Sequence, residues 1–164
     1  MRKRHTIAAF LIGFSLVFGP SALAQRIDAP VRMKDLPKAV SNTVRQQSEG
    51  AKLLRLFSQT ENGQTWYEAE LKAQGHIRSV LIDQNGQVIE IEEEVALASL
   101  PPGARTTLRQ KAGEGRITSV ESITRNNVIT AYAAHVNTRG KRSEIKVDAD
   151  GKLISVGSTS LVVR

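Results

Sequence analysis

The pattern Asp-x-(Asp/Asn)-Gly-x-(Val/Leu)-Ile occurs twice in this chain, at residues 83–89 and 148–154, with a spacing of 65 residues. Further upstream, Leu36-Pro37 matches Leu100-Pro101 at a spacing of 64 residues. The difference of one residue indicates a single insertion, which fits best near Asn126-Asn127, where a hairpin turn would absorb it. Such a sustained register predicts two tandem repeats with the same order of secondary-structure elements.

Each repeat has the pattern of a helix followed by strands. Leu36, Val40 and Val44 recur every four residues, which is the spacing of one helix face. Asp35 is the expected N-cap of this helix, and Gly50 marks its end. Alternating apolar residues and glycine-containing turns then predict four strands, at residues 51–60, 64–73, 76–83 and 87–93.

The second repeat has the same order of elements. The predicted fold class is therefore α+β, with two tandem units, each a helix packed on a four-stranded antiparallel sheet. The expected domain boundaries are a signal peptide at 1–24, an N-terminal linker at 25–34, repeat 1 at 35–98, repeat 2 at 99–156 and a C-terminal tail at 157–164.

The first 24 residues have the pattern of a secretory signal peptide. The basic residues 2–4 precede an apolar run at residues 7–18, and Ala22-Leu23-Ala24 supplies the small residues of a cleavage site. The alternative is an uncleaved membrane anchor, although the apolar run is short for a span of about 20 residues. We expect a periplasmic or secreted protein with no transmembrane segment after cleavage.

Composition excludes several classes of protein. The chain has no cysteine, which excludes disulfide scaffolds, thiol enzymes and cysteine-ligated zinc sites. Cleavage would lower the formal net charge from +7 to +4, because three basic residues leave with the signal peptide. This mild charge on an exported chain argues against nucleic acid as a partner. The expected partner is a protein or peptide, and the oligomeric state is not indicated.

Alternation along the strands predicts which side chains face the helices. The inward positions are expected to be Leu54, Leu56, Tyr67, Ala69, Leu71, Val80, Ile82, Thr118 and Val120. The opposite face is then expected to carry Arg55, Phe57, Gln59, Trp66, Glu68, Glu70 and Lys72, with Ala131, Ala133, His135 and Asn137 in the second repeat.

The order of these elements resembles the PepSY-like family, which includes β-lactamase-inhibitor-like proteins. The resemblance is carried by the two hairpin motifs at 83–89 and 148–154 and by the helix starts at Leu36-Pro37 and Leu100-Pro101, and it covers roughly residues 34–156. It implies an exported binding or inhibitory role without a shared active site. An inhibitor of a periplasmic or extracellular enzyme, such as a peptidase, is one form of this role.

Motifs for catalysis are not found in the sequence. There is no G-x-S-x-G elbow and no H-E-x-x-H pair. His76 and His135 fall at polar strand positions and are expected to be solvated. We therefore expect no enzyme activity, no catalytic residues, no metal site and no cofactor.

An acidic run supports an alternative function. Glu90, Glu92 and Glu94 share one face of a strand, and carboxylates bind hard cations such as calcium. The second hypothesis is therefore an envelope structural or cation-buffering protein that uses the strand Glu90–Glu94. The other interpretation of these glutamates is a solvated strand face. The motifs at 83–86 and 148–151 faintly resemble the start of a calcium-binding loop, but Val88, Ile89 and Ile91 follow a strand pattern, which favours a hairpin turn.

The candidate partner-binding residues are Arg55, Phe57, Trp66 and Glu68. Phe57 and Trp66 are two of only four aromatic residues beyond the signal peptide, and both are assigned to the face away from the helix. Exposed aromatic residues often anchor protein interfaces. The alternative is that the other repeat or the tail residues 161–163 cover this face.

Overall fold

The computed structural model describes residues 27–61 and 63–158, and the predicted signal peptide and tail residues 161–163 lie outside these ranges. The strands are β1 (Ile27–Pro30), β2 (Ala51–Glu61), β3 (Gln64–Ala73), β4 (His76–Asp83), β5 (Val88–Glu94), β6 (Arg116–Arg125), β7 (Val128–Thr138), β8 (Lys141–Asp148) and β9 (Leu153–Ser158). The helices are α1 (Lys38–Gln47) and α2 (Pro102–Ala112), preceded by the 3-10 turns η1 (Met33–Asp35) and η2 (Leu97–Ser99). Within these ranges, neither helix is long and apolar enough to cross a membrane.

All nine strands belong to one antiparallel sheet, whose order follows the chain from β1 to β9. The expected α+β class, with two units that each place a helix on a separate four-stranded sheet, is therefore wrong. Strand β5 pairs directly with β6, from Ile91 opposite Thr124 to Glu94 opposite Glu121, and this pairing makes one mostly β structure. Hairpin pairings follow from local turns, whereas β5 and β6 are separated by η2 and α2, so no local signal specifies their pairing.

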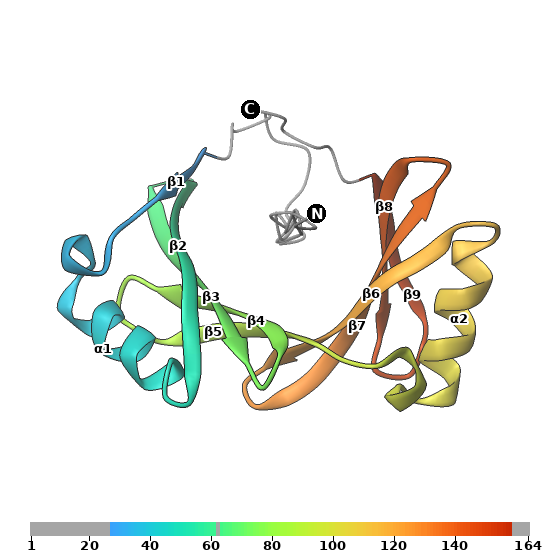
Figure 1. Ribbon diagram of the computed structural model, residues 1–164, viewed down its shortest axis with the longest axis horizontal. Coiled ribbons are helices and arrows are strands. Elements are labelled where there is room, and N and C mark those ends of the chain that lie inside the picture. Colours follow the sequence, from blue (N-terminus) through green and yellow to red (C-terminus); the bar gives the residue numbers. More distant parts are fainter. Residues whose placement is uncertain (1–26, 62, 159–164) are drawn as a thin grey trace, which may run out of the picture.

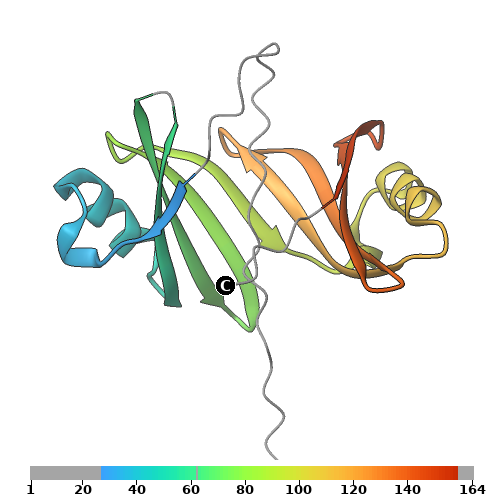
Figure 2. The ribbon, with the colours of Figure 1, turned by 90° about the horizontal axis from the view of Figure 1, so that it is seen from above.

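The sheet is strongly curved, and both helices lie on its convex side (Figures 1 and 2). Helix α1 covers the first strands and α2 covers the last ones, so the middle of the sheet lies between them. We call the surface opposite the helices the concave face.

Each helix packs an apolar stripe against the sheet. In α1, Val40 and Val44 are fully buried against a cluster formed by Leu36, Leu56, Ala69, Leu71, Val80 and Ile82. In α2, the buried residues Ala104 and Leu108 pack on a second cluster, formed by Leu100, Val120, Tyr132, Ala134, Val136, Ile145 and Val147. Burying one such aliphatic side chain contributes roughly 1.5–3 kcal/mol, so both clusters stabilise the contact between helix and sheet.

The expected cap of the first helix is wrong. Asp35 lies in η1 and pairs with Arg32 at 2.6 Å, and α1 begins three residues later, at Lys38. The cause is Pro37, because a proline forces the preceding residue into extended backbone. Leu36 accordingly has φ −76° and ψ 148°.

The repeated hairpin motif has a direct physical explanation. The Oδ1 atom of Asp83 accepts hydrogen bonds from the backbone N–H groups of Asn85 (2.9 Å) and Gln87 (2.7 Å). The Oδ1 atom of Asp148 does the same for Asp150 (3.1 Å) and Lys152 (2.8 Å). Both carboxylates thus stabilise hairpin turns, in agreement with the interpretation of these motifs as turns rather than as calcium loops.

β-Bulges correct part of the predicted face assignment. The register of β2 and β3 shifts between Leu53 and Arg55, so Leu53, not Leu54, packs on the first cluster. The same shift in β6 brings Ile117, not Thr118, onto the second cluster. A bulge inserts one residue into a strand, and strict alternation therefore misplaces the positions next to it.

The glycine of each motif allows its hairpin to touch a helix, and this contact can be tested. Gly151 has φ +90°, and a Cβ there would overlap the backbone of Gly103 and Ala104 at the start of α2. Gly75 has φ +92°, yet a Cβ there would meet nothing within 4 Å. Gly75→Ala therefore carries only backbone strain, of about 1–3 kcal/mol. We expect Gly151→Ala to lose a further ~1–3 kcal/mol from overpacking, measured by urea unfolding. Equal losses in the two variants would contradict the close hairpin–helix contact.

Candidate functional site

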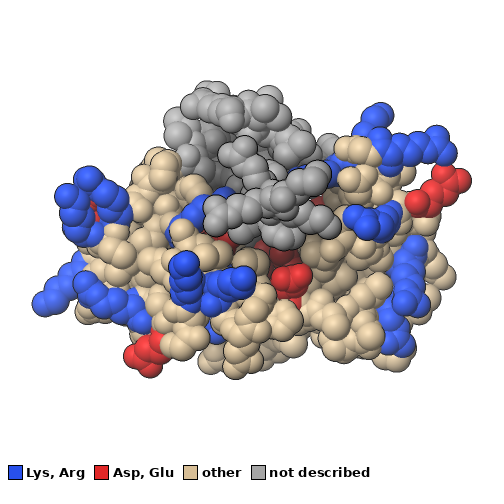
Figure 3. Space-filling view, in the orientation of Figure 1, with Lys and Arg blue, Asp and Glu red and all other residues tan. Residues whose placement is uncertain are grey.

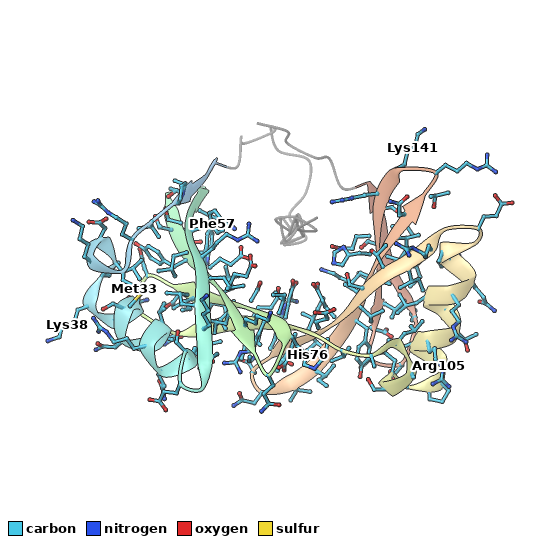
Figure 4. All side chains as sticks on the ribbon, viewed as in Figure 1. Met33, Lys38, Phe57, His76, Arg105 and Lys141 are labelled. Carbon is cyan, nitrogen blue, oxygen red and sulfur yellow. The ribbon has the colours of Figure 1, made fainter. Side chains whose placement is uncertain are left out.

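The concave face carries all four candidate partner-binding residues. Arg55 and Phe57 come from β2, and Trp66 and Glu68 come from the adjacent strand β3. Phe57 lies opposite Glu68 in the strand register, so these two side chains share the face. Figure 4 labels Phe57 on the inner side of the arm that β2 forms. Phe57 and Trp66 are partly exposed, whereas Glu68 is buried.

Arg55 organises this end of the face. Its guanidinium forms an ion pair with Glu70 at 2.7 Å and lies 6.0 Å from the centre of the Phe57 ring. Glu68 accepts a hydrogen bond from Gln59 Nε2 at 3.3 Å. The structure thus brings the four predicted residues together and adds Gln59 and Glu70 to them.

The main feature that the sequence analysis missed is an acidic centre on the concave face. It comprises seven glutamates from β3, β5, β6 and β8, which are Glu68, Glu70, Glu90, Glu92, Glu94, Glu121 and Glu144. In Figure 3, acidic atoms are visible in the middle of the molecule, and most basic side chains lie towards its periphery. The glutamates of β3 and β5 carry a visible two-residue alternation, but only the strand pairing shows that all seven converge.

Three ion pairs and one hydrogen bond link part of this centre to basic side chains. In addition to the Arg55 pair, Arg125 binds Glu90 at 2.6 Å, and His135 Nε2 lies 3.2 Å from Glu121. Lys146 lies 3.8 Å from Glu144. The expectation of a solvated His135 is wrong, because only 6% of the residue is exposed.

Glu92 lies at the middle of one row of paired residues that crosses seven strands. From β2 to β8 the row reads Arg55, Glu70, Ser79, Glu92, Ile123, Ala131 and Asp148. The immediate cross-strand neighbours of Glu92 are therefore Ser79 and Ile123, neither of which carries a charge. Glu92 is only 7% exposed, and within the described residues its carboxylate has no hydrogen bond or ion pair.

The environment of Glu92 disfavours its charged form. Burial raises the pKa of the Glu92 carboxyl well above its ordinary value, and the negative charges of Glu121, Glu90 and Glu144 raise it further. The ammonium of Lys146 partly opposes this effect and lowers the pKa.

The acidic strand differs from what the sequence analysis expected. Glu90 and Glu92 are buried, so the prediction of a solvated strand face is wrong. Across residues 27–61 and 63–158, no group of three or more His, Asp or Glu side chains has an arrangement that could hold a metal ion. Of the carboxylates of β5, that of Glu90 forms an ion pair with Arg125 on β6, and that of Glu94 accepts a hydrogen bond from the backbone N–H of Ile77 on β4.

The fold and the site define a class of protein with one curved antiparallel sheet, two helices on its convex side and an acidic concave face. Comparison with solved structures finds this fold in proteins of Bacteroides. A DUF2874 family protein from Bacteroides uniformis has a TM-score of 0.61 at 14% identity, over 77% of this chain and 92% of that chain. A BLIP-like protein from Bacteroides fragilis has a TM-score of 0.56 at 17% identity, over 79% and 92% of the two chains.

A third structure, a Bacteroides eggerthii protein expected to be periplasmic, has a TM-score of 0.59 at 13% identity, over 75% of this chain and 88% of that chain. At these identities the likeness concerns the fold. No protein-family model matches the chain, and no curated protein matches it.

The raised pKa of Glu92 predicts an effect on stability. A carboxyl with a raised pKa in the folded state binds its proton more tightly than in the unfolded state, so stability falls as the pH rises from the ordinary glutamate value to the raised one. Glu92→Gln removes this cost, and we expect its melting temperature to exceed that of the parent by a few degrees at neutral pH. The difference should vanish below the ordinary pKa of glutamate, where both states of the parent are protonated. A lower melting temperature of the variant at neutral pH would show that ionised Glu92 is stabilising.

Proposed function

We propose that the protein is an exported, non-catalytic binding module that presents the concave face of its sheet to a protein or peptide partner. The observation that carries this proposal is the division of the aromatic residues. Tyr67 and Tyr132 pack with the two apolar clusters, whereas Phe57 and Trp66 lie on the concave face beside the acidic centre. Aromatic residues with charged neighbours are typical anchors of protein interfaces.

Two further observations support an exported module. The first 24 residues have the pattern of a signal peptide, and one protein of the same fold is expected to be periplasmic. A periplasmic location is consistent with both the signal-peptide pattern and the expected location of that neighbour. The similarity to the PepSY-like family and the interpretation of the chain as two tandem repeats are also part of what we propose.

The BLIP-like neighbour supports inhibition as the form that this binding takes. In our proposal the partner is a periplasmic or extracellular enzyme, such as a peptidase, which the module blocks by occupying the enzyme's surface. Arg55 and Glu68 flank the aromatic anchors and set the orientation of the partner. Charged groups at an interface contribute mainly to specificity and to the association rate.

The cation-buffering alternative uses the same acidic strand and makes a different prediction. Glu90 is already neutralised by Arg125, which leaves fewer charges for a free cation. Calcium titration by calorimetry separates the two functions, because a buffer binds calcium without any protein partner.

Trp66 provides the test of the proposed function. Proteins captured from a periplasmic extract by the immobilised module are purified and titrated against Trp66→Ala. We expect the affinity to fall by on the order of 2 kcal/mol, which is roughly 30-fold, as for an interface anchor. Val156→Ala is the control, because Val156 is 58% exposed and lies opposite Ile145, whose side chain packs on the convex side with the α2 cluster. Equal binding by both variants would contradict the concave face as the interface, and inhibition of a captured enzyme tests the inhibitory role.

A further inference from the structure

The acidic centre contains one buried carboxylate to which the described residues offer neither a hydrogen bond nor an ion pair. Four of its seven glutamates have the partners described above. Glu70, Glu90 and Glu144 form ion pairs with Arg55, Arg125 and Lys146, and Glu121 shares a hydrogen bond with His135. Glu68 accepts a hydrogen bond from Gln59 at 3.3 Å, and Glu94 accepts one from the backbone N–H of Ile77 at 3.5 Å. Glu92 is the remaining member, and it has no hydrogen bond or ion pair with any other described residue.

Burying a carboxylate without a partner is costly, and natural proteins pair the great majority of buried charges. The cost at Glu92 is increased by its own neighbours, because Glu90 and Glu94 flank it along β5 and Glu121 lies on the next strand. These negative charges repel one another and would all attract a cation placed among them. The position is therefore unfavourable for the free protein and favourable for a cationic ligand.

The size and chemistry of the cation follow from the same geometry. Calcium needs six to eight converging oxygen ligands. The described side chains offer no such convergence, because Ser79 and Ile123 flank Glu92 across the sheet and the other carboxylates are held by their own partners. A single accepting carboxylate in a field of negative charge suits an ammonium or guanidinium group, which forms charge-assisted hydrogen bonds with one or two oxygens.

We propose that the partner inserts a lysine or arginine side chain into the acidic centre, where Glu92 accepts its charge. This inference rests on the proposed function and specifies its partner as a protein or peptide with an exposed cationic residue. The aromatic residues Phe57 and Trp66, on the same face, would contact the apolar stem or the neighbours of that residue. Charge complementarity would also steer the partner toward the concave face.

The experiment compares two adjacent glutamates. Glu92→Gln removes the unpaired charge on the concave face, and Glu93→Gln makes the same change one residue along β5, on the opposite face, where Glu93 pairs in register with Arg78. The probes are short Gly/Ser peptides that contain lysine, arginine or acetyl-lysine, titrated by calorimetry against protein purified from the periplasm. We expect the lysine or arginine peptide to bind, the acetyl-lysine peptide not to bind, and Glu92→Gln to weaken binding about tenfold while Glu93→Gln leaves it unchanged.

Several outcomes would overturn the inference. These are no binding of either cationic peptide, equal binding of the acetylated peptide, and equal effects of the two substitutions. Binding of calcium alone that disappears in Glu92→Gln would also overturn it, because the site would then serve a metal ion.

Glu92→Gln and Glu93→Gln are also titrated against the partner captured in the Trp66 experiment. If Trp66→Ala weakens that complex and Glu92→Gln does not, the cationic contact is refuted while the proposed function stands. If neither Trp66→Ala nor Glu92→Gln weakens the complex, both proposals fail. Weakening by Glu92→Gln but not by Glu93→Gln supports the cationic contact on the natural partner.

Discussion

The pairing of β5 with β6 is the interaction on which the rest of the structure depends. It involves only four register pairs, from Ile91 opposite Thr124 to Glu94 opposite Glu121. These few pairs convert two groups of strands, each covered by its own helix, into one continuous sheet. Because both helices lie on the same side of that sheet, its other side becomes one concave face (Figure 1). The same junction places Glu92 at the middle of this face.

The two faces of the sheet follow different physical rules. On the convex side, aliphatic residues such as Val80 and Ile145 are fully or almost fully buried under the helices, and the usual hydrophobic stabilisation applies. On the concave side, charged residues from several strands lie close together and depend on ion pairs such as Arg125–Glu90. Natural proteins accept such costs where a function requires them. In our proposal, the cost carried by Glu92 is a feature of a binding surface.

Most of the local structure could be predicted from the sequence, because its signals are local. Four of the five strands before α2, from β2 to β5, were predicted almost to the residue, since alternation and glycine-containing turns lie within a few positions of each other. Strand β1, at Ile27–Pro30, was missed, because it falls within the segment expected to be a linker. The placement of Phe57 and Trp66 on one face was also predicted correctly by alternation. Alternation failed at Leu54 and Thr118, where bulges shift the register, and the cap at Asp35 failed because Pro37 delays the helix.

By itself, the sequence determined the hairpins, the two helices, the apolar positions that face them and the Asp-centred turns, because each depends on residues that are neighbours in the chain. The tertiary structure alone decided that the sheet is continuous and that the glutamates of β3, β5, β6 and β8 form one acidic centre. It also decided that His135 is buried and that Glu92 has only Ser79 and Ile123 beside it. The physical reason is that strand pairing across an intervening helix is set by the packing of the whole sheet, which brings together residues that no local pattern connects.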